Sequence, residues 1–96
     1  MLQVNEYILP LDFTLDKQKD INVDLPKGSK IISCTFCYDQ RKIFYEHDSR
    51  NNSGKEKHVF YMFKHGKPTT DNLALYDHFK TFDAANATFH LFKLKT

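Results

Sequence analysis

The sequence predicts an all-β protein, a small antiparallel sandwich or partly closed barrel of about six or seven strands. Apolar and polar side chains alternate along most of the chain, the spacing of strands buried on one face. Short groups of turn-forming residues separate these segments. With 96 residues, 41% of them hydrophobic, the chain is expected to form a single domain over residues 1–96.

Two half-buried strands are expected in the first quarter of the chain. Every second residue is apolar over residues 11–15 and again over residues 21–25. The polar residues 16–19 are expected to form a turn between them. A second turn is expected at residues 26–29, because Pro26 presets its own φ and Gly28 tolerates a positive φ.

The middle of the chain predicts three further strands. Residues 30–38 are rich in aromatic and β-branched side chains, and the short polar segment 39–41 predicts a hairpin to a strand at 42–47. The very polar residues 48–57 are expected to form a flexible surface loop. Residues 58–64 are apolar on both faces and are expected to form a central strand, which residues 65–68 end.

The last third contains one segment that the sequence leaves open. Between residues 71 and 82 the apolar side chains fit a short helix, with Asp71 as its N-cap, and they fit a strand equally well. Residues 83–86 predict a turn. Residues 88–95 predict a closing strand, with Phe89 and Leu91 on one face and Phe92 and Leu94 on the other.

The charge is nearly balanced overall but unevenly distributed. The net charge is +2, with five acids and two lysines in residues 1–24 and twelve basic and seven acidic residues after them. This balance argues against a dedicated nucleic-acid-binding protein, which needs a strong basic stripe. Ordinary solvated surface explains the distribution, and a basic patch for an anionic ligand or partner is the alternative.

The two cysteines form a Cys-x-x-Cys pair within an apolar segment. On a strand, Cys34 and Cys37 would point to opposite faces, so we expect apolar packing rather than a redox pair or half of a zinc site. Free thiols fit a reducing, cytoplasmic setting.

No apolar run approaches the ~18 residues needed to cross a bilayer. No basic residue precedes an apolar core at the N-terminus, so neither membrane nor secretory targeting is expected.

No catalytic or metal-binding motif is recognisable. The sequence lacks phosphate-binding glycine loops, nucleophile elbows and the His-Glu-x-x-His pattern. The five histidines have no ligand-like spacing. We therefore expect a protein that is not an enzyme, with no metal and no cofactor.

Aromatic and basic residues supply the candidate binding site. Lys64, His65 and Lys67 lie directly after an aromatic strand, and Arg50 is a further candidate for contacting an anion. Tyr45 and Tyr61 are the candidates for stacking on a ligand ring, because tyrosine combines a flat apolar body with a polar tip. The nine phenylalanines are expected mainly in the core.

The layout of the whole chain resembles a family of short proteins of unknown function found mostly in bacteriophages and prophages. The resemblance rests on four segments: Glu6-Tyr7-Ile8-Leu9-Pro10, residues 24–33 with their Leu-Pro-Lys-Gly turn, His65-Gly66-Lys67-Pro68, and Phe89-His90-Leu91-Phe92. Residues 49–57 and Lys67 depart from the family pattern. The resemblance implies an all-β fold, a strand at residues 76–82 and a viral origin, and it assigns no functional residue.

These observations favour a non-enzymatic binding protein that acts by occupancy, either inhibiting a host defence protein or sequestering an anionic, nucleotide-like ligand. One alternative is a small β-barrel that binds single-stranded nucleic acid, and another is a virion accessory or assembly protein. Small β-domains expose edge strands, so a homo-oligomer is expected as well. The partner, the pocket and the oligomeric state are not specified by the sequence.

Overall fold

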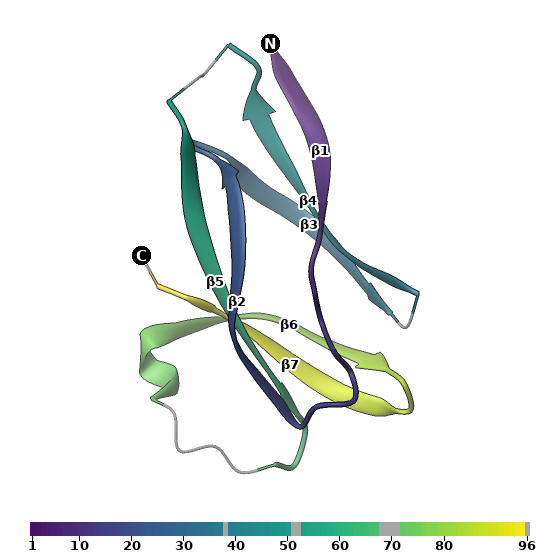
Figure 1. Ribbon diagram of the computed structural model, residues 1–96. Helices are drawn as coiled ribbons and strands as arrows, with labels where there is room; N and C mark the ends of the chain where they lie inside the picture. The colour runs from purple at the N-terminus through teal and green to yellow at the C-terminus, as the bar shows by residue number, and fades with distance from the viewer. Residues whose placement is uncertain (38, 51–52, 68–71, 96) are drawn as a thin grey trace.

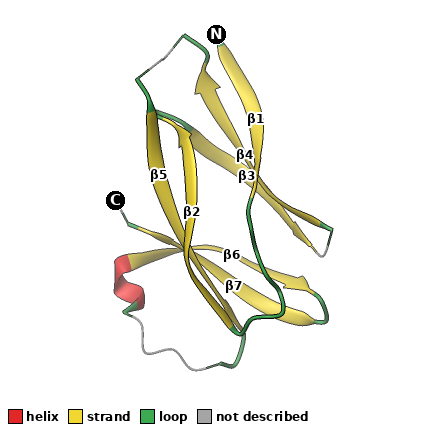
Figure 2. Ribbon diagram, in the orientation of Figure 1, coloured by secondary structure: helices red, strands yellow, loops and turns green. Residues whose placement is uncertain are grey.

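The computed structural model describes residues 1–37, 39–50, 53–67 and 72–95 and, within them, an all-β fold (Figures 1 and 2). The predicted fold class is confirmed. The described residues form seven strands and one short 3-10 helix: β1 Leu2–Ile8, β2 Lys17–Pro26, β3 Lys30–Cys37, β4 Gln40–Asp48, β5 Lys55–Lys64, η1 Leu73–Leu75, β6 Tyr76–Ala84 and β7 Ala87–Leu94.

The strands form two antiparallel sheets that do not close into a barrel. One sheet has three strands in the order β1-β4-β3, and the other has four in the order β2-β5-β7-β6. The expected central strand is therefore confirmed in β5, which lies between β2 and β7. The chain passes from the four-stranded to the three-stranded sheet at the predicted turn after Pro26, where Gly28 has a φ of +86° and the Ser29 amide donates to the Pro26 carbonyl over 3.0 Å.

The expected strand at residues 11–15 is wrong, although its alternation reports burial correctly. Leu9, Leu11 and Phe13 are buried, but this segment connects β1 to β2 without pairing in either sheet. Its backbone is held by side chains instead, because the Gln18 amide donates to the Pro10 carbonyl over 2.7 Å and Arg41 Nη1 donates to the Leu11 carbonyl over 2.7 Å. The segment fills one side of the core.

The expected turn at residues 16–19 is also wrong. Most of these polar residues belong to β2, which begins at Lys17 and contains a register shift between Gln18 and Ile21. At this irregularity Asp20 has a φ of +55°. The bulge absorbs the polar residues within the strand, so the chain does not reverse there.

The open segment near residue 71 resolves into a short helix followed by a strand. The Asn72 side chain caps η1 by accepting from the Ala74 amide over 3.1 Å, and β6 starts at the next residue after η1. Asp71, the expected cap, lies outside the described residues. A register shift between His78 and Lys80 keeps Phe79 against the core, which explains why the helical spacing and the alternation both fit this segment.

The polar stretch 48–57 is shorter as a loop than expected. Asp48 ends β4 and Lys55 begins β5, and residues 51 and 52 lie outside the described residues. The tight connection between β6 and β7 confirms the predicted turn, since Ala85 and Asn86 both have positive φ values, +50° and +63°. This is the geometry of a two-residue type I′ hairpin.

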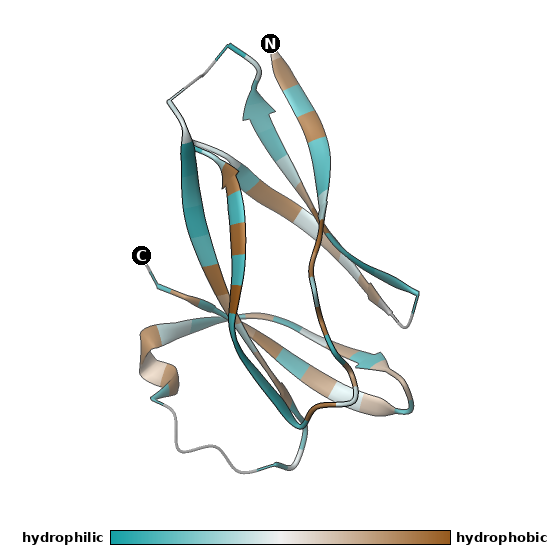
Figure 3. Cartoon of the chain, viewed as in Figure 1, coloured by the Kyte–Doolittle hydropathy of each residue, from teal (hydrophilic) through white to brown (hydrophobic). Residues whose placement is uncertain are grey.

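The core forms between the facing surfaces of the two sheets. Figure 3 shows the alternation along β2 that turns its apolar side chains to one face. Aromatic rings dominate this core, with Phe82 contacting Phe13, Phe36 and Phe89 at centroid distances of 5.1–5.9 Å. The fully buried side chains include Leu9, Leu11, Val23, Leu25, Ile43, Phe60, Met62, Phe89 and Leu91. Among the described residues, no helix has the length and hydropathy of a membrane span.

Candidate functional site

A continuous chain of hydrogen bonds joins three histidines and a threonine on the four-stranded sheet. His65 Nδ1 lies 2.9 Å from His90 Nε2, and His90 Nδ1 lies 2.9 Å from Thr81 Oγ1. Thr81 Oγ1 in turn lies 2.7 Å from His78 Nε2. We call these four residues the histidine chain; it extends from the end of β5 across β7 to β6.

Strand alternation and register place the histidine chain on the face turned away from the core. Phe89 and Leu91 of β7 are buried, so His90 and Phe92 point to the opposite face. In the ladder, His90 lies opposite both Phe63 of β5 and Thr81 of β6. Residues up to 27 positions apart in the sequence therefore meet as cross-strand neighbours.

Two phenylalanines lie beside the histidine chain, on the same face of the sheet. The rings of Phe63 and Phe92 are stacked, with centroids 5.4 Å apart and an interplanar angle of 19°. His90 contacts Phe63 at 5.4 Å, and His78 meets Phe92 edge-on at 5.4 Å. Both phenylalanines are partly exposed. We call Phe63, Phe92 and the histidine chain together the aromatic–histidine face.

The hydrogen bonds restrict where protons can lie in the histidine chain. Neutral imidazole has one donor and one acceptor nitrogen, so a neutral His90 that donates to Thr81 must accept from His65. If His90 donates to His65, Thr81 must donate to His90. The histidine chain can therefore carry its protons in either of two directions, and the His65–His90 and His90–Thr81 bonds reverse together between them.

The electrostatics of the face favour the neutral form of its central histidine. Burial lowers the pKa of His90, and repulsion from His65 and His78 lowers it further. Both nitrogens of His90 are used within the chain, whereas His65 and His78 each use one. The second nitrogens of His65 and His78 are the groups with which the chain can contact a ligand.

The geometry does not form a metal centre. In the part of the chain that the structure describes, no three histidine, cysteine or acidic side chains converge as metal ligands. Cys34 is a free thiol, partly buried, and burial raises its pKa, so the thiol form dominates. The side chain of Cys37 lies outside what the structure describes, so the expected opposition of the two thiols stays a prediction.

The expected basic cluster is only partly formed. His65 belongs to the histidine chain, but the two lysines beside it share one acidic partner. Lys64 Nζ lies 3.6 Å and Lys67 Nζ 3.7 Å from the Asp16 carboxylate. One carboxylate thus offsets only one of the two positive charges, and the contact ties the end of β5 to the segment before β2.

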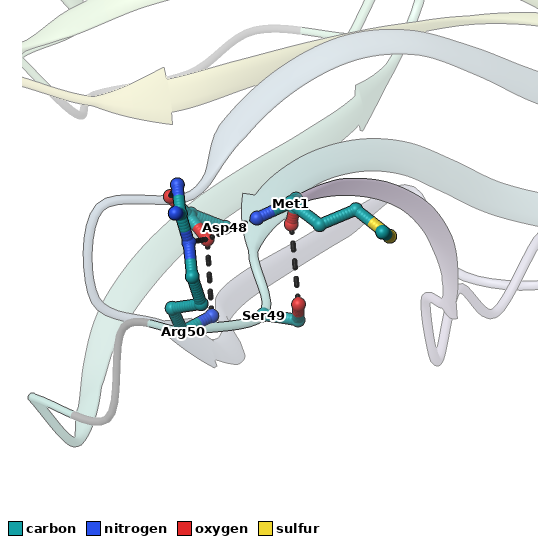
Figure 4. Close-up of polar contacts among 4 residues, drawn as sticks. All are labelled: Met1, Asp48, Ser49 and Arg50. Atoms are coloured by element: carbon teal, nitrogen blue, oxygen red, sulfur yellow. Dashed lines mark hydrogen bonds and ion pairs between the residues drawn. The ribbon is translucent and has the colours of Figure 1, made fainter.

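Arg50 lies at the other end of the molecule from this cluster. It precedes β5, whereas Lys64 ends it, and ten residues of strand span about 30 Å. Figure 4 shows the Arg50 guanidinium directed at the Asp48 carboxylate, at 3.0 Å and 3.1 Å. Asp48 also accepts from the Met1 ammonium group at 3.0 Å, and these contacts, those of Arg50 first, hold the pKa of Asp48 far below its usual range.

Of the two tyrosines expected to stack on a ligand, one is buried and the other is half-buried. Tyr61 is 0% exposed and contacts Phe63 and Tyr76, so the expectation for this residue is corrected. Tyr45 is half-buried and packs against the core from β4. The structure thus brings neither tyrosine together with Arg50, Lys64 and Lys67 in one site.

Sequence reasoning missed His78, Thr81, His90, Phe63 and Phe92 as neighbours. One signal was present, because the predicted alternation of residues 88–95 already places His90 on the face of Phe92. The pairing of β5 and β6 with β7 was not visible, because it depends on non-local register.

The comparisons with known proteins give a family but no activity. No curated protein and no solved structure matches the chain. A family model described as a domain of unknown function, DUF7352, matches residues 7–96, which include every residue of the aromatic–histidine face. The chain therefore belongs to the DUF7352 family.

Proposed function

We propose that the chain is a binding protein that acts by occupancy and holds a small ligand with a planar ring and an anionic group, such as a nucleotide, on the aromatic–histidine face. The observation that carries the proposal is the contact of His90 with Phe63 at 5.4 Å within a continuous histidine chain. Ring-stacking and anion-contacting groups are thereby adjacent on one surface.

The phenylalanines supply the stacking part of the site. Phe63 and Phe92 lie on β5 and β7, the two central strands of the four-stranded sheet, and both keep part of their surface exposed. Aromatic side chains on central strands are a recurring platform for bases, because every base has a flat π-face. Stacking of this kind contributes about 1–3 kcal/mol per base.

The histidines supply the anion-contacting part. His65 and His78 are exposed at the two ends of the chain, and each retains a ring nitrogen that the chain does not use. An imidazole donates to a phosphate in its neutral form and adds a positive charge when protonated. The free ring nitrogens of His65 and His78 are therefore the groups expected to contact the anionic part of the ligand.

The charge pattern favours a small ligand over a nucleic-acid strand. A strand is held by many phosphate contacts to lysine and arginine. Here Lys64 and Lys67 share Asp16, and Arg50 is engaged by Asp48 at the far end of the molecule. With these basic side chains paired to acids, a ligand with a single phosphate at the histidines fits the surface better than a strand with many phosphates.

The test is calorimetric titration with three probes: a nucleoside monophosphate, the matching nucleoside and inorganic phosphate. We expect the monophosphate to bind, and each part alone to bind at least tenfold more weakly. Equal binding of inorganic phosphate would reduce the site to an anion site. A single-stranded oligonucleotide, titrated at two salt concentrations, distinguishes the strand-binding alternative, whose affinity should fall steeply with salt.

Matched variants locate the site. Phe92→Leu should weaken binding of the monophosphate, whereas Phe44→Leu, on β4 of the other sheet, should not. His65→Gln should weaken it as well, with His47→Gln on β4 as its control. If the two members of each pair behave alike, the ligand does not bind on the aromatic–histidine face.

A further inference from the structure

We propose that two copies of this chain associate through β1, which pairs antiparallel with its symmetry mate about a two-fold axis at Asn5. The two three-stranded sheets would then form one continuous six-stranded sheet. This interface is separate from the aromatic–histidine face, which lies on the other sheet. It also lies largely before the region that matches the family.

The strand β1 is exposed to an unusual degree for a regular strand. It forms the edge of the three-stranded sheet, and among the described residues only β4 pairs with it (Figure 1). Leu2, Val4 and Ile8 share one face and are 66%, 62% and 73% exposed. A row of exposed apolar side chains on an unpaired edge is a ready surface for another strand.

The other edge strands carry features that discourage pairing, and β1 carries none of them. The edge strands β2, β3 and β6 each contain a register shift, and each includes at least one lysine. The pairing of β1 with β4 is regular over all seven residues, and residues 2–8 contain no proline and no lysine. Bulges, prolines and lysines are the usual protection of an edge against association.

The backbone of β1 specifies which residues can pair with a second strand. The Leu9 amide donates to the Arg41 carbonyl over 2.7 Å, and the Ser49 amide donates to the Met1 carbonyl over 2.9 Å. In an antiparallel ladder the hydrogen-bonded residues alternate, so the odd-numbered residues of β1 bond to β4. The amides and carbonyls of Leu2, Val4, Glu6 and Ile8 therefore point to the free edge.

Only even-numbered residues can then form hydrogen-bonded pairs across the two-fold axis, and odd-numbered residues face one another at the non-hydrogen-bonded positions between them. An axis at Asn5 pairs Leu2 with Ile8 of the second copy and Val4 with Glu6, which uses all four outward-facing residues of each strand. An axis at Glu6 would place two carboxylates directly opposite, which is unfavourable. An axis at Val4 would pair fewer residues and would leave Ile8 without a partner.

The charge on β1 is compatible with this register. Glu6 already contacts Lys42 of β4, with Oε2 2.9 Å from Nζ, so its charge is offset within its own sheet. In the paired sheet, Leu2 and Ile8 of opposite copies would cover each other at both ends of the interface. Asn5 would meet Asn5 of the second copy at a non-hydrogen-bonded position, where facing Cα atoms are about 4.5 Å apart.

Cysteine cross-linking tests the register. Asn5→Cys and, as the matched control, Gln3→Cys are oxidised under mild conditions, and the disulfides are assigned by peptide mass spectrometry. We expect a disulfide between the two copies of residue 5, formed at least tenfold faster than one between the two copies of residue 3. In this register the latter are four residues apart along the strands, about 13 Å. Equal rates, a faster reaction at residue 3 or no cross-link would each overturn the pairing.

Sedimentation equilibrium tests the association without added cysteines. We expect the unmodified chain to dimerise reversibly, and Val4→Pro to weaken the dimer at least tenfold, because proline removes an amide that points to the free edge and none that bonds to β4. Ile32→Lys, on β3 of the same sheet, is the control and should dimerise normally. A monomeric chain, or a Val4→Pro variant that folds and dimerises like the unmodified chain, would overturn the proposal.

Discussion

His65 Nδ1 and His90 Nε2 lie 2.9 Å apart, and their ring centroids are separated by 5.1 Å. At this distance one proton lies between two nitrogens, so one ring must donate and the other must accept. A proton on each nitrogen would break the contact. The contact therefore couples the protonation of an exposed histidine at the end of β5 to that of a partly buried one on β7.

The stability of the fold should depend on the protonation of His90. The pKa of His90 is lowered by burial and by His65 and His78, whereas in the unfolded chain it is near 6.5. Between these two pH values the unfolded chain binds more protons, so the free energy of unfolding should decrease as the pH falls below about 6.5. Urea denaturation at several pH values measures this. His90→Phe should weaken the dependence of the free energy of unfolding on pH. An unchanged dependence in this variant would show that His90 is not its source.

His58 should contribute a second decrease in the free energy of unfolding as the pH falls. It is buried on the inner face of β5, and neither of its ring nitrogens has a hydrogen-bond partner among the described residues; Glu56 Oε1 lies 3.6 Å from Nε2. Burial, and then Lys93, lower its pKa. His58→Leu should raise the free energy of unfolding at pH 7 by about 1 kcal/mol, since it removes unsatisfied polar atoms. A loss of stability at pH 7 would mean that the imidazole is satisfied in solution.

Arg41 should be the main anchor of the segment between β1 and β2. Its Nη1 donates to the Leu11 carbonyl over 2.7 Å, and its guanidinium lies 5.0 Å from the centroid of the Phe13 ring. Arg41→Ala should lower the free energy of unfolding by about 2 kcal/mol, because a hydrogen bond from a charged group and a cation–π contact are both lost. Arg41→Lys keeps the charge, so its free energy of unfolding should lie between those of Arg41→Ala and the unmodified chain. Equal stability of Arg41→Ala and the unmodified chain would show that the segment holds without this contact.

The β6–β7 hairpin should be open to stabilisation. Ala85 has a φ of +50°, and a left-handed conformation is unfavourable for alanine and better tolerated by asparagine. Ala85→Asn should raise the free energy of unfolding by about 0.5–1 kcal/mol, and Asn86→Ala should lower it by a similar amount. Thermal unfolding of both variants provides the measurement. Shifts of the same sign would contradict a type I′ turn.

The sequence indicated the fold class and most of the strands because alternation records which side chains are buried. It failed at residues 11–15, where Leu11 and Phe13 are buried from a segment whose backbone is held by Arg41 and Gln18 rather than by a neighbouring strand. Alternation cannot distinguish these two cases, because it reports burial and not backbone pairing.

The candidate site was less predictable because it depends on register. His65 could be selected from its position after an aromatic strand, but its partner His90 is 25 residues away and meets it only because β5 pairs with β7. Tyr61 was misjudged for the same reason. Its exposure depends on Phe63 and Tyr76, which cover it in the folded chain and which no local pattern identifies.

The central proposal is tested most directly by an NMR titration of the uniformly labelled protein with a nucleoside monophosphate. The imidazole signals of His65, His78 and His90 and the ring signals of Phe63 and Phe92 should shift together and saturate with one binding constant. The signals of His47 and Phe44, on the other sheet, should remain unchanged. Saturable shifts confined to the three-stranded sheet, or no saturable shift at any ring, would contradict a ligand site on the aromatic–histidine face.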